Sequence, residues 1–223
     1  GNKKNMKINN ELIIKSEEYL KNAFDNSNYL ILHHSDREYR LQHSYRVANI
    51  GKIIAEKESF DITEMVIGCL LHDIAYLEEF KGKNDWLNHG RNSAEIARPF
   101  LLSLGLKENR VDDICYGIAI HVDNKADFEG NPTAFAETIG DADNIDRFDV
   151  YRIYETLEYN KFSQMTFDDK NKKVNETLDK LNEYIKMQLG TQTETEMWKE
   201  RIQFYISFYE KLKEQLSNST SIY

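Results

Sequence analysis

The sequence predicts an all-α protein, because prolines are few and apolar residues recur at helical spacing. Only two prolines occur in 223 residues. Most segments repeat apolar residues at steps of three and four, and few show the alternation typical of strands. A chain of this length can bury about 70% of its unfolded surface in one core. We therefore expect a single domain over residues 1–223, built as a bundle of about seven to eight helices.

Five helices are predicted in the first half of the chain. They cover residues 11–24, residues 36–58, a segment that starts at Asp61 or Thr63 and carries His72 and Asp73, a segment from His89 to near Gly105, and a segment from Asn109 to His121. Gly105 is placed as a helix stop, and Pro99 should kink the fourth helix or remove one of its hydrogen bonds. Residues 78–88 and 122–132 are polar and are predicted to be loops.

Three further helices are predicted in the second half of the chain. The first is long, over residues 133–159, the next covers residues 172–189, and the last carries an apolar stripe at steps of four and three, made by Trp198, Ile202, Tyr205, Tyr209, Leu212 and Leu216. Such a stripe must be covered by another element. We expect the helices of residues 172–216 to pack on their own domain or to form the contact of a homodimer.

The composition limits the partners of the protein. The chain is 40% hydrophobic and 30% charged, with a formal net charge of -9. This acidic balance gives no positive surface for a nucleic acid polymer or an anionic membrane, so both are disfavoured as partners. The two cysteines, Cys69 and Cys115, lie in apolar helical patterns and are expected to be buried thiols. Cysteine usage of this kind favours a cytoplasmic location.

A His–Asp pair, His72 and Asp73, sits in the most apolar stretch of the chain, MVIGCLLHDIAYL at residues 65–77. A buried carboxylate without a partner costs several kcal/mol, so Asp73 should be hydrogen-bonded, ion-paired or bound to a metal. Adjacent residues on a helix point about 100° apart. Any ion bound by this pair would therefore need ligands from other elements.

Other helices offer such ligands. The candidates are His43, His89, His121 and Asp143, each on or at the start or end of a different predicted helix. Neutral imidazole together with carboxylate is the ligand set of Zn, Mn, Fe or Co, whereas an all-oxygen set would favour Ca or Mg. Several polar side chains that are buried independently also need hydrogen-bond partners. The simplest explanation is that these side chains contact one another.

These residues, in this order, resemble the HD-domain superfamily of metal-dependent phosphohydrolases. The matching contexts are HSYRVA with His43, CLLHDIA with His72 and Asp73, and GDADNID with Asp143, within a core of about residues 36–160. Two further pieces resemble the branch that adds two histidines: HGRNSAEIARPFL, which begins at His89, and IAIHVD, which contains His121. The resemblance implies an HD-type helical bundle.

The same resemblance implies one or two divalent metal ions, of Mn, Fe, Co, Zn or Ni, with Mg as a further option. In families that keep both added histidines a second metal can bind, with the aspartate of the HD pair as the bridge, which would be Asp73. Asp143 aligns best with the last ligand of the family, and Asp141 is the reserve. The two lie on opposite sides of a helix, so only one should bind metal.

The activity that the resemblance implies is hydrolysis of a phosphate ester or anhydride of a small phosphorylated molecule such as a nucleotide. Asp73 is then catalytic through the metal, and cationic side chains should hold the remaining phosphate charge. Arg147 is the first candidate, because it follows Asp143 by four residues. Arg46 is a second catalytic candidate, and Arg91 a second substrate-binding candidate. The segment RFDVYRIYE, at residues 147–155, departs from the small residues usual in relatives, which leaves the pocket shape open.

Two other functions share this ligand set. One is a di-iron oxygenase of the same superfamily, which uses its metals for oxygen chemistry on a polyol or organophosphonate. The other is a binding module that keeps the metal for structure or for sensing a nucleotide. Iron that changes redox state would distinguish the first, and metal binding without turnover the second.

Overall fold

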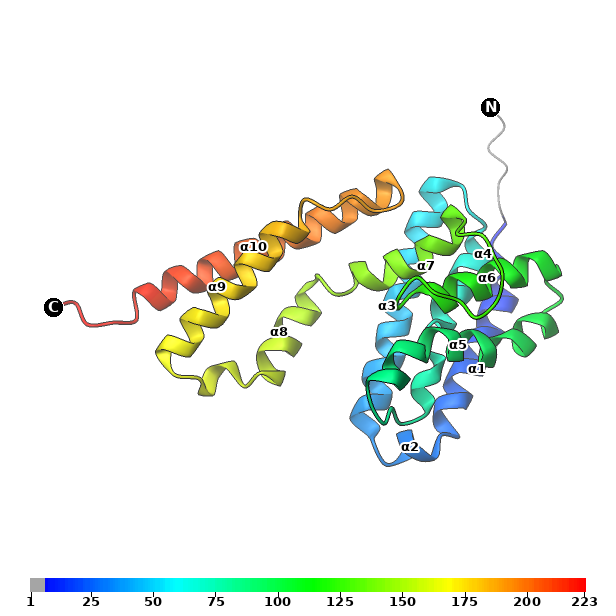
Figure 1. Ribbon diagram of the computed structural model, residues 1–223, viewed down its shortest axis with the longest axis horizontal. Helices are drawn as coiled ribbons and strands as arrows, with labels where there is room; N and C mark the ends of the chain where they lie inside the picture. The colour runs from blue at the N-terminus through cyan, green and yellow to red at the C-terminus, as the bar shows by residue number, and fades with distance from the viewer. Residues whose placement is uncertain (1–6) are drawn as a thin grey trace. The chain divides into compact units, whose positions relative to one another are not determined.

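The computed structural model describes residues 7–223, and over that range it is helical with no strand (Figure 1). The α-helices are α1 (Asn10–Asp25), α2 (Asn28–Ile31), α3 (His34–Glu58), α4 (Ile62–Leu71), α5 (Lys83–Ser103), α6 (Glu108–Ile120), α7 (Ala134–Ile145), α8 (Val150–Tyr159), α9 (Phe167–Tyr184) and α10 (Gln192–Ser217). Two short 3-10 helices cover Ile74–Leu77 and Phe162–Gln164. The all-α prediction is confirmed. Among the described helices, none is both long and apolar enough to cross a bilayer.

The chain divides into two compact units. The first ends at Asp143, and the second covers Asn144–Tyr223. Each has its own buried residues, with α1 to α6 and most of α7 in the first and α8 to α10 in the second. The organisation of the whole chain as one domain stays a prediction.

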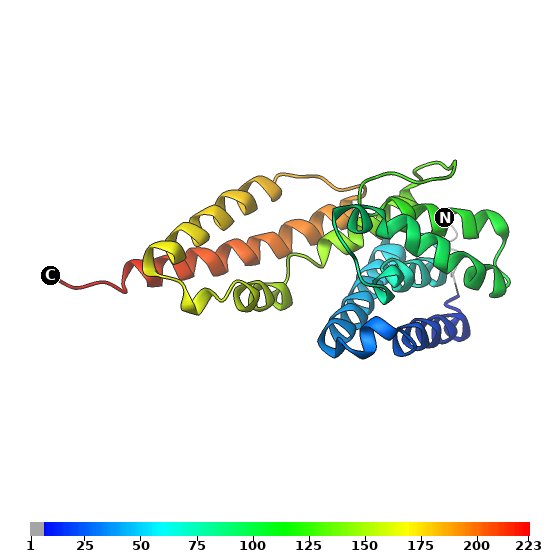
Figure 2. The same ribbon diagram turned by 60° about the horizontal axis from the view of Figure 1, so that its bottom comes forward.

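Helix α4 lies at the centre of the first unit. Every residue from Thr63 to Leu71 is buried, and α4 packs against α1, α3 and α6 (Figures 1 and 2). Asp61 caps its start by accepting a hydrogen bond from the backbone of Glu64. A helix that is buried on all sides delivers the residues at its end into the core, and here those residues are His72 and Asp73.

Two glycines allow the helices around α4 to approach closely. A Cβ placed on Gly51 of α3 would lie 2.6 Å from the sulfur of Cys69 on α4. A Cβ on Gly90 of α5 would lie 2.6 Å from the backbone oxygen of Ala119 on α6. Both positions leave no room for a side chain, so backbone and side chains of the facing helices meet there. The buried thiols predicted for Cys69 and Cys115 are confirmed.

Several helix boundaries differ from the prediction. Helix α5 begins at Lys83, six residues before His89, and runs through Pro99 to Ser103. The first predicted loop is therefore shorter, and His89 lies inside the helix and not at its start. The stop at Gly105 is confirmed, since this residue follows the helix with a φ of 77°. The four-residue helix α2, whose start Ser27 caps, was not predicted.

The long helix predicted over residues 133–159 is wrong. Helix α7 ends at Ile145 and α8 begins at Val150. Asp149 ends the intervening segment by accepting a hydrogen bond from the backbone of Val150, and it pairs with Arg201 at 2.9 Å. The ring of Phe148 packs against Trp198, with ring centres 4.7 Å apart. These contacts fix residues 146–149 outside a helix.

In the second unit α9 and α10 lie side by side (Figures 1 and 2). The apolar stripe of α10 is buried at all but one of its six predicted positions, with Leu212 the partly exposed one. Helix α9 covers Phe167–Tyr184, shifted by about one turn from the predicted range of residues 172–189. The stripe thus packs within its own chain, and the contact with a second subunit stays a prediction.

Candidate metal centre

The histidines and aspartates that the sequence singles out meet in the first unit. His43 comes from α3, His72 and Asp73 follow the end of α4, His89 comes from α5, His121 follows the end of α6, and Asp143 comes from α7. All six are buried, with exposed fractions of 9% or less. Five helices therefore aim polar side chains at one buried point of an otherwise apolar core.

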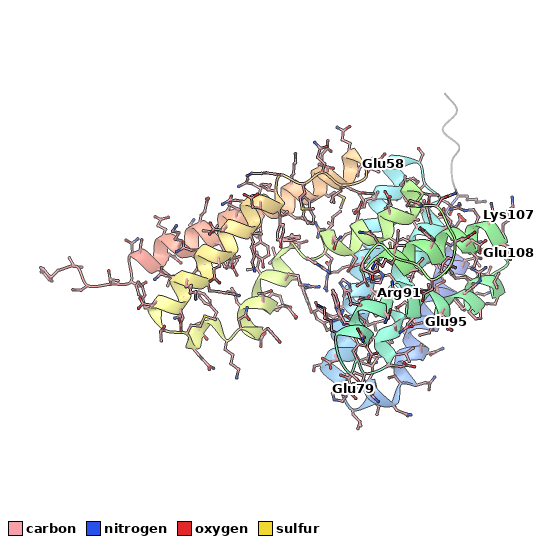
Figure 3. All side chains as sticks on the ribbon, in the orientation of Figure 1. Glu58, Glu79, Arg91, Glu95, Lys107 and Glu108 are labelled. Carbon is pink, nitrogen blue, oxygen red and sulfur yellow. The ribbon has the colours of Figure 1, made fainter. Side chains whose placement is uncertain are left out.

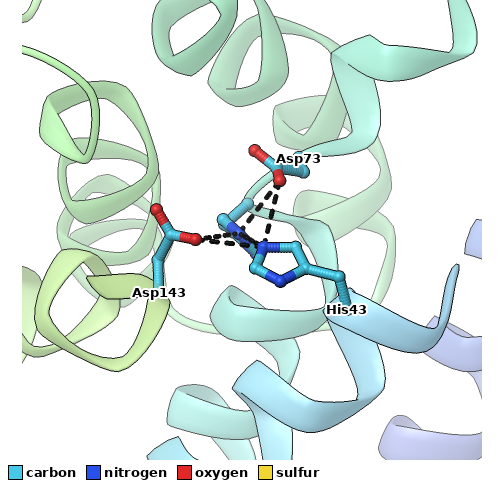
Figure 4. A group of neighbouring side chains, drawn as sticks. His43, Asp73 and Asp143 are labelled. Carbon is cyan, nitrogen blue, oxygen red and sulfur yellow. Dashed lines mark hydrogen bonds and ion pairs between the residues drawn. The ribbon is translucent and has the colours of Figure 1, made fainter. Parts of the chain in front are cut away.

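The first group of ligands combines two histidines and two aspartates. The Nε2 atoms of His43 and His72 lie 3.3 Å apart. Each is 3.3 Å from Oδ2 of Asp73, and Oδ1 of Asp143 lies 3.0 Å from His43 and 3.5 Å from His72. Figure 4 shows both carboxylates directed toward the ring of His43. The four ligand atoms form one compact set that could hold an ion.

The second group uses the other oxygen of the same aspartate. Oδ1 of Asp73 lies 3.2 Å from Nε2 of His89 and 3.1 Å from Nε2 of His121. The two histidine nitrogens are 3.1 Å apart. These three residues form a second set of ligand atoms that could hold an ion. One carboxylate thus serves both groups, with one oxygen facing each.

Backbone carbonyls fix the orientation of three of the four rings. Nδ1 of His72 lies 2.6 Å from the carbonyl oxygen of Cys69, and Nδ1 of His121 lies 2.7 Å from that of Ile118. Nδ1 of His89 contacts the carbonyl oxygen of Trp86 in the same way. Because a carbonyl only accepts, Nδ1 must carry the proton, and the lone pair of a neutral ring is then on Nε2. This is the usual outer contact of a metal-binding histidine.

The arrangement fits a transition metal. Donor atoms about 2.0–2.1 Å from a tetrahedral ion lie about 3.3 Å from each other, and the donor atoms of both groups are separated by 3.0–3.5 Å. The donors are imidazole nitrogens and carboxylate oxygens, the set that Zn, Mn, Fe, Co and Ni accept.

The electrostatics of the first group also favour a cation. Burial by itself raises the pKa of the Asp73 and Asp143 carboxyls. The surrounding histidines lower these pKa values by more than burial raises them, so both lie well below the usual range. Burial lowers the pKa of His72, while the charge of Asp73 and hydrogen bonds to Asp143 raise it to about 9. Both carboxylates are therefore ionised at neutral pH and stabilise positive charge beside them.

Of the two aspartates considered for the last ligand, the structure brings Asp143 into the first group. Asp141 is half-buried and is not among the residues of either group. The helical register of α7 explains the difference, since residues two apart point to opposite sides of a helix.

The three predicted phosphate-binding arginines lie in different surroundings. Arg91, labelled on α5 in Figure 3, contacts Asp123 at 3.0 Å and also Asn88. Arg147 is exposed and belongs to the second unit. It does not share a helix face with Asp143, because α7 ends at Ile145. Arg46 is half-buried on α3. Their roles toward a substrate stay predictions.

Arg40 was not predicted, and its side chain pairs with the shared aspartate, Asp73. Its Nη1 atom lies 3.5 Å from Oδ2 of Asp73. The guanidinium carbon lies 3.5 Å from the ring centre of Tyr76. The available signal was spacing, because Arg40 precedes His43 by three residues and so shares its face of α3.

The part of the chain that carries this site matches a known domain family. The HD domain family model matches residues 40–148, a range that includes all six ligand residues. No curated protein shows significant similarity to the chain. Among solved structures, a predicted HD superfamily hydrolase from an uncultured Thermotogales bacterium is 20% identical, covering 90% of this chain and 91% of its own, with a TM-score of 0.63. Bacillus subtilis YpgQ, in complex with ADP, is 16% identical, covering 92% and 95%, with a TM-score of 0.60. This chain therefore contains an HD domain, at residues 40–148.

Proposed function

We propose that this protein is a metal-dependent phosphohydrolase that cleaves a phosphate ester or anhydride of a small molecule in the cytoplasm. The observation that carries the proposal is the carboxylate of Asp73, which turns one oxygen to each of two groups of histidines. Paired metal sites that share a carboxylate suit the in-line displacement of phosphate esters, where the attacking and leaving oxygens both need stabilisation.

The protein side chains have defined tasks in this reaction. His43, His72, Asp73 and Asp143 would hold one ion, and Asp73, His89 and His121 a second. A bound divalent metal supplies a Lewis acid that polarises a phosphoryl oxygen and lowers the pKa of water. In the overall reaction a water oxygen forms the new bond to phosphorus and the bond to the leaving oxygen breaks. One proton of the water passes to the leaving oxygen of an ester, or to solvent when the leaving group of an anhydride stays ionised. The buried carbonyl contacts of the histidines keep their Nε2 atoms directed at the site throughout.

Nucleotides are the first substrate class to test. A solved structure with the same fold, Bacillus subtilis YpgQ, is described in complex with ADP. Its identity to this chain is 16%, so the likeness supports the choice of a first panel and not an assignment. Small phosphomonoesters and inorganic polyphosphates complete that panel.

The test is phosphate release with added Mn, Co, Mg or Zn, comparing wild type with Asp73→Ala. We expect release by wild type alone, because the substitution removes a ligand from both groups. The matched control is Asp113→Ala, since Asp113 is a largely buried carboxylate that pairs with Arg110 and not with the histidines. Metal content is measured on all three proteins.

Release by Asp73→Ala at the rate of wild type would contradict the proposal. Metal binding without release from any member of the panel would also contradict it. In that case oxygen consumption by the iron-loaded protein would support the di-iron oxygenase, and its absence the non-catalytic binding module.

A further inference from the structure

Arg40 lies where it can reach both the metal ligands and a neighbouring cavity. Its side chain is 24% exposed, and its Nη1 atom lies 3.5 Å from Oδ2 of Asp73. That distance is longer than the roughly 2.7–3.2 Å of an ordinary N–H···O hydrogen bond. A guanidinium has five N–H donors, so an anionic oxygen can approach the same group without displacing a short ion pair.

Two tyrosines hold the guanidinium in place. Its central carbon lies 3.5 Å from the ring centre of Tyr76 and 5.0 Å from that of Tyr39. Stacking on aromatic faces fixes the plane of an arginine and restricts its rotamers. A cation that is already oriented loses little conformational entropy when it binds a ligand. Arg40 is therefore arranged like a binding residue.

Arg40 also lines a cavity of about 220 Å³, whose lining does not include Asp73. Half of its lining residues are aromatic, and the lining residues are Tyr29, Leu30, Asp36, Tyr39, Arg40, Tyr76, Glu78 and Phe80. The ring of Phe80 packs on Tyr76 with ring centres 4.4 Å apart. Pockets that enclose a whole drug-sized ligand have about 300–1,000 Å³, so this cavity suits one planar group of a larger molecule.

The charges of the wall decide which part of a phosphorylated ligand enters. Asp36 and Glu78 line the cavity, and their carboxylates would repel a phosphate that entered it. They can accept hydrogen bonds from hydroxyl or amino groups. The phosphate must then stay on the metal side of Arg40, while an aromatic group with hydrogen-bond donors fits between the rings.

We propose that Arg40 binds the phosphoryl group of the substrate beside the metal ligands, and that the cavity next to it accepts an aromatic group joined to that phosphate. The inference rests on the proposed function and deepens it, because it names a class of substrate. Nucleobases are planar rings with amino donors and so belong to this class.

The first test measures binding of inorganic phosphate to the Mn-loaded protein by calorimetry. Arg40→Gln should raise the dissociation constant by roughly tenfold or more, as expected for loss of a charge-assisted hydrogen bond, with metal content unchanged. The matched control is Arg37→Gln, since Arg37 lies one turn earlier on α3 and pairs with Asp25 and Glu38. The control should bind phosphate like wild type.

The outcomes separate the two proposals. If wild type holds metal but neither binds phosphate nor hydrolyses any phosphoester, the proposed function fails, and the inference with it. If wild type binds phosphate and Arg40→Gln behaves like Arg37→Gln, only the role of Arg40 is overturned. If Arg40→Gln loses metal, Arg40 supports Asp73 instead of the substrate, and the inference is again overturned.

The second test concerns the cavity and compares two ligands that the enzyme cannot hydrolyse at a P–O ester bond. Phenylphosphonate and methylphosphonate share the phosphonate, and only the first has a ring. We expect Phe80→Ala to weaken the binding of phenylphosphonate about tenfold, which is in the range of ring-stacking energies. The affinity for methylphosphonate should stay within about twofold of wild type. The control is Phe128→Ala, an exposed phenylalanine that packs on Tyr116. Equal effects on both ligands, or none, would overturn the role of the cavity.

Discussion

Replacing Gly90 by alanine should damage the second group of metal ligands through the backbone. A Cβ at this position would lie 2.6 Å from the carbonyl oxygen of Ala119 and 3.0 Å from that of Ile118. Both contacts are with backbone of α6, which cannot turn aside as a flexible side chain can. Helices α5 and α6 must then separate, and the Nε2 atoms of His89 and His121, now 3.1 Å apart, separate with them.

Two opposing contributions set the change in the free energy of unfolding. Alanine is favoured over glycine inside a helix by about 1 kcal/mol, while overpacking at a contact that cannot relax costs about 1–3 kcal/mol. The free energy of unfolding, measured with urea on the metal-free protein, should therefore fall by up to about 2 kcal/mol. Metal titration should show the second ion bound more weakly, with the first unaffected.

The matched control is Gly140→Ala in α7. Its new Cβ would come no closer than 3.4 Å, to the Cα atom of His121, which is an ordinary contact. That variant should keep its metal content and gain up to about 1 kcal/mol from helix propensity. If Gly90→Ala is stabilised by the same amount and still binds two ions, the close approach of α5 and α6 does not position the histidines.

Three further predictions concern individual side chains. His89→Ala should remove one of two bound ions, since His89 contacts only the second group, and an unchanged stoichiometry by atomic absorption would contradict this. Metal binding at about pH 7 should release about one proton, because the pKa of His72 is raised to about 9 without metal. The release, measured by calorimetry in buffers of different ionisation enthalpy, should diminish as the pH rises through 9, where the ring has already lost this proton. Arg147→Gln should leave the metal content unchanged, because Arg147 follows the end of α7 and belongs to neither group of ligands, and loss of metal would assign Arg147 a structural role.

Much of the helical core was predictable because its signals are local. Helical spacing of apolar residues and the caps at Asp61 and Gly105 depend on neighbours within a few positions. The meeting of His43, His72 and Asp143 was predictable for a different reason: buried polar groups need partners, and the family resemblance supplied their order. The short contexts around these residues carried that information.

The errors arose where distant contacts decide local structure. Residues 146–149 leave the helix because Phe148 packs on Trp198 and Asp149 pairs with Arg201, and both partners lie about 50 residues later. The spacing of apolar residues within a short stretch of sequence carries no information on contacts between residues so far apart. Arg40 was missed for a similar reason, because its importance comes from stacking on Tyr76, which only the folded chain brings near.

The ends of α4 and α6 have an electrostatic consequence for the centre. His72 and His121 are the first residues after these helices, so both helices end at the same point. The carboxyl end of a helix carries a partial charge of about −0.5 from its aligned peptide dipoles, and here two such ends meet beside two carboxylates. The resulting field draws divalent cations in and opposes the approach of any free anion. A phosphorylated ligand must therefore arrive at a centre already neutralised by metal, which orders the events of binding: metal first, phosphate second.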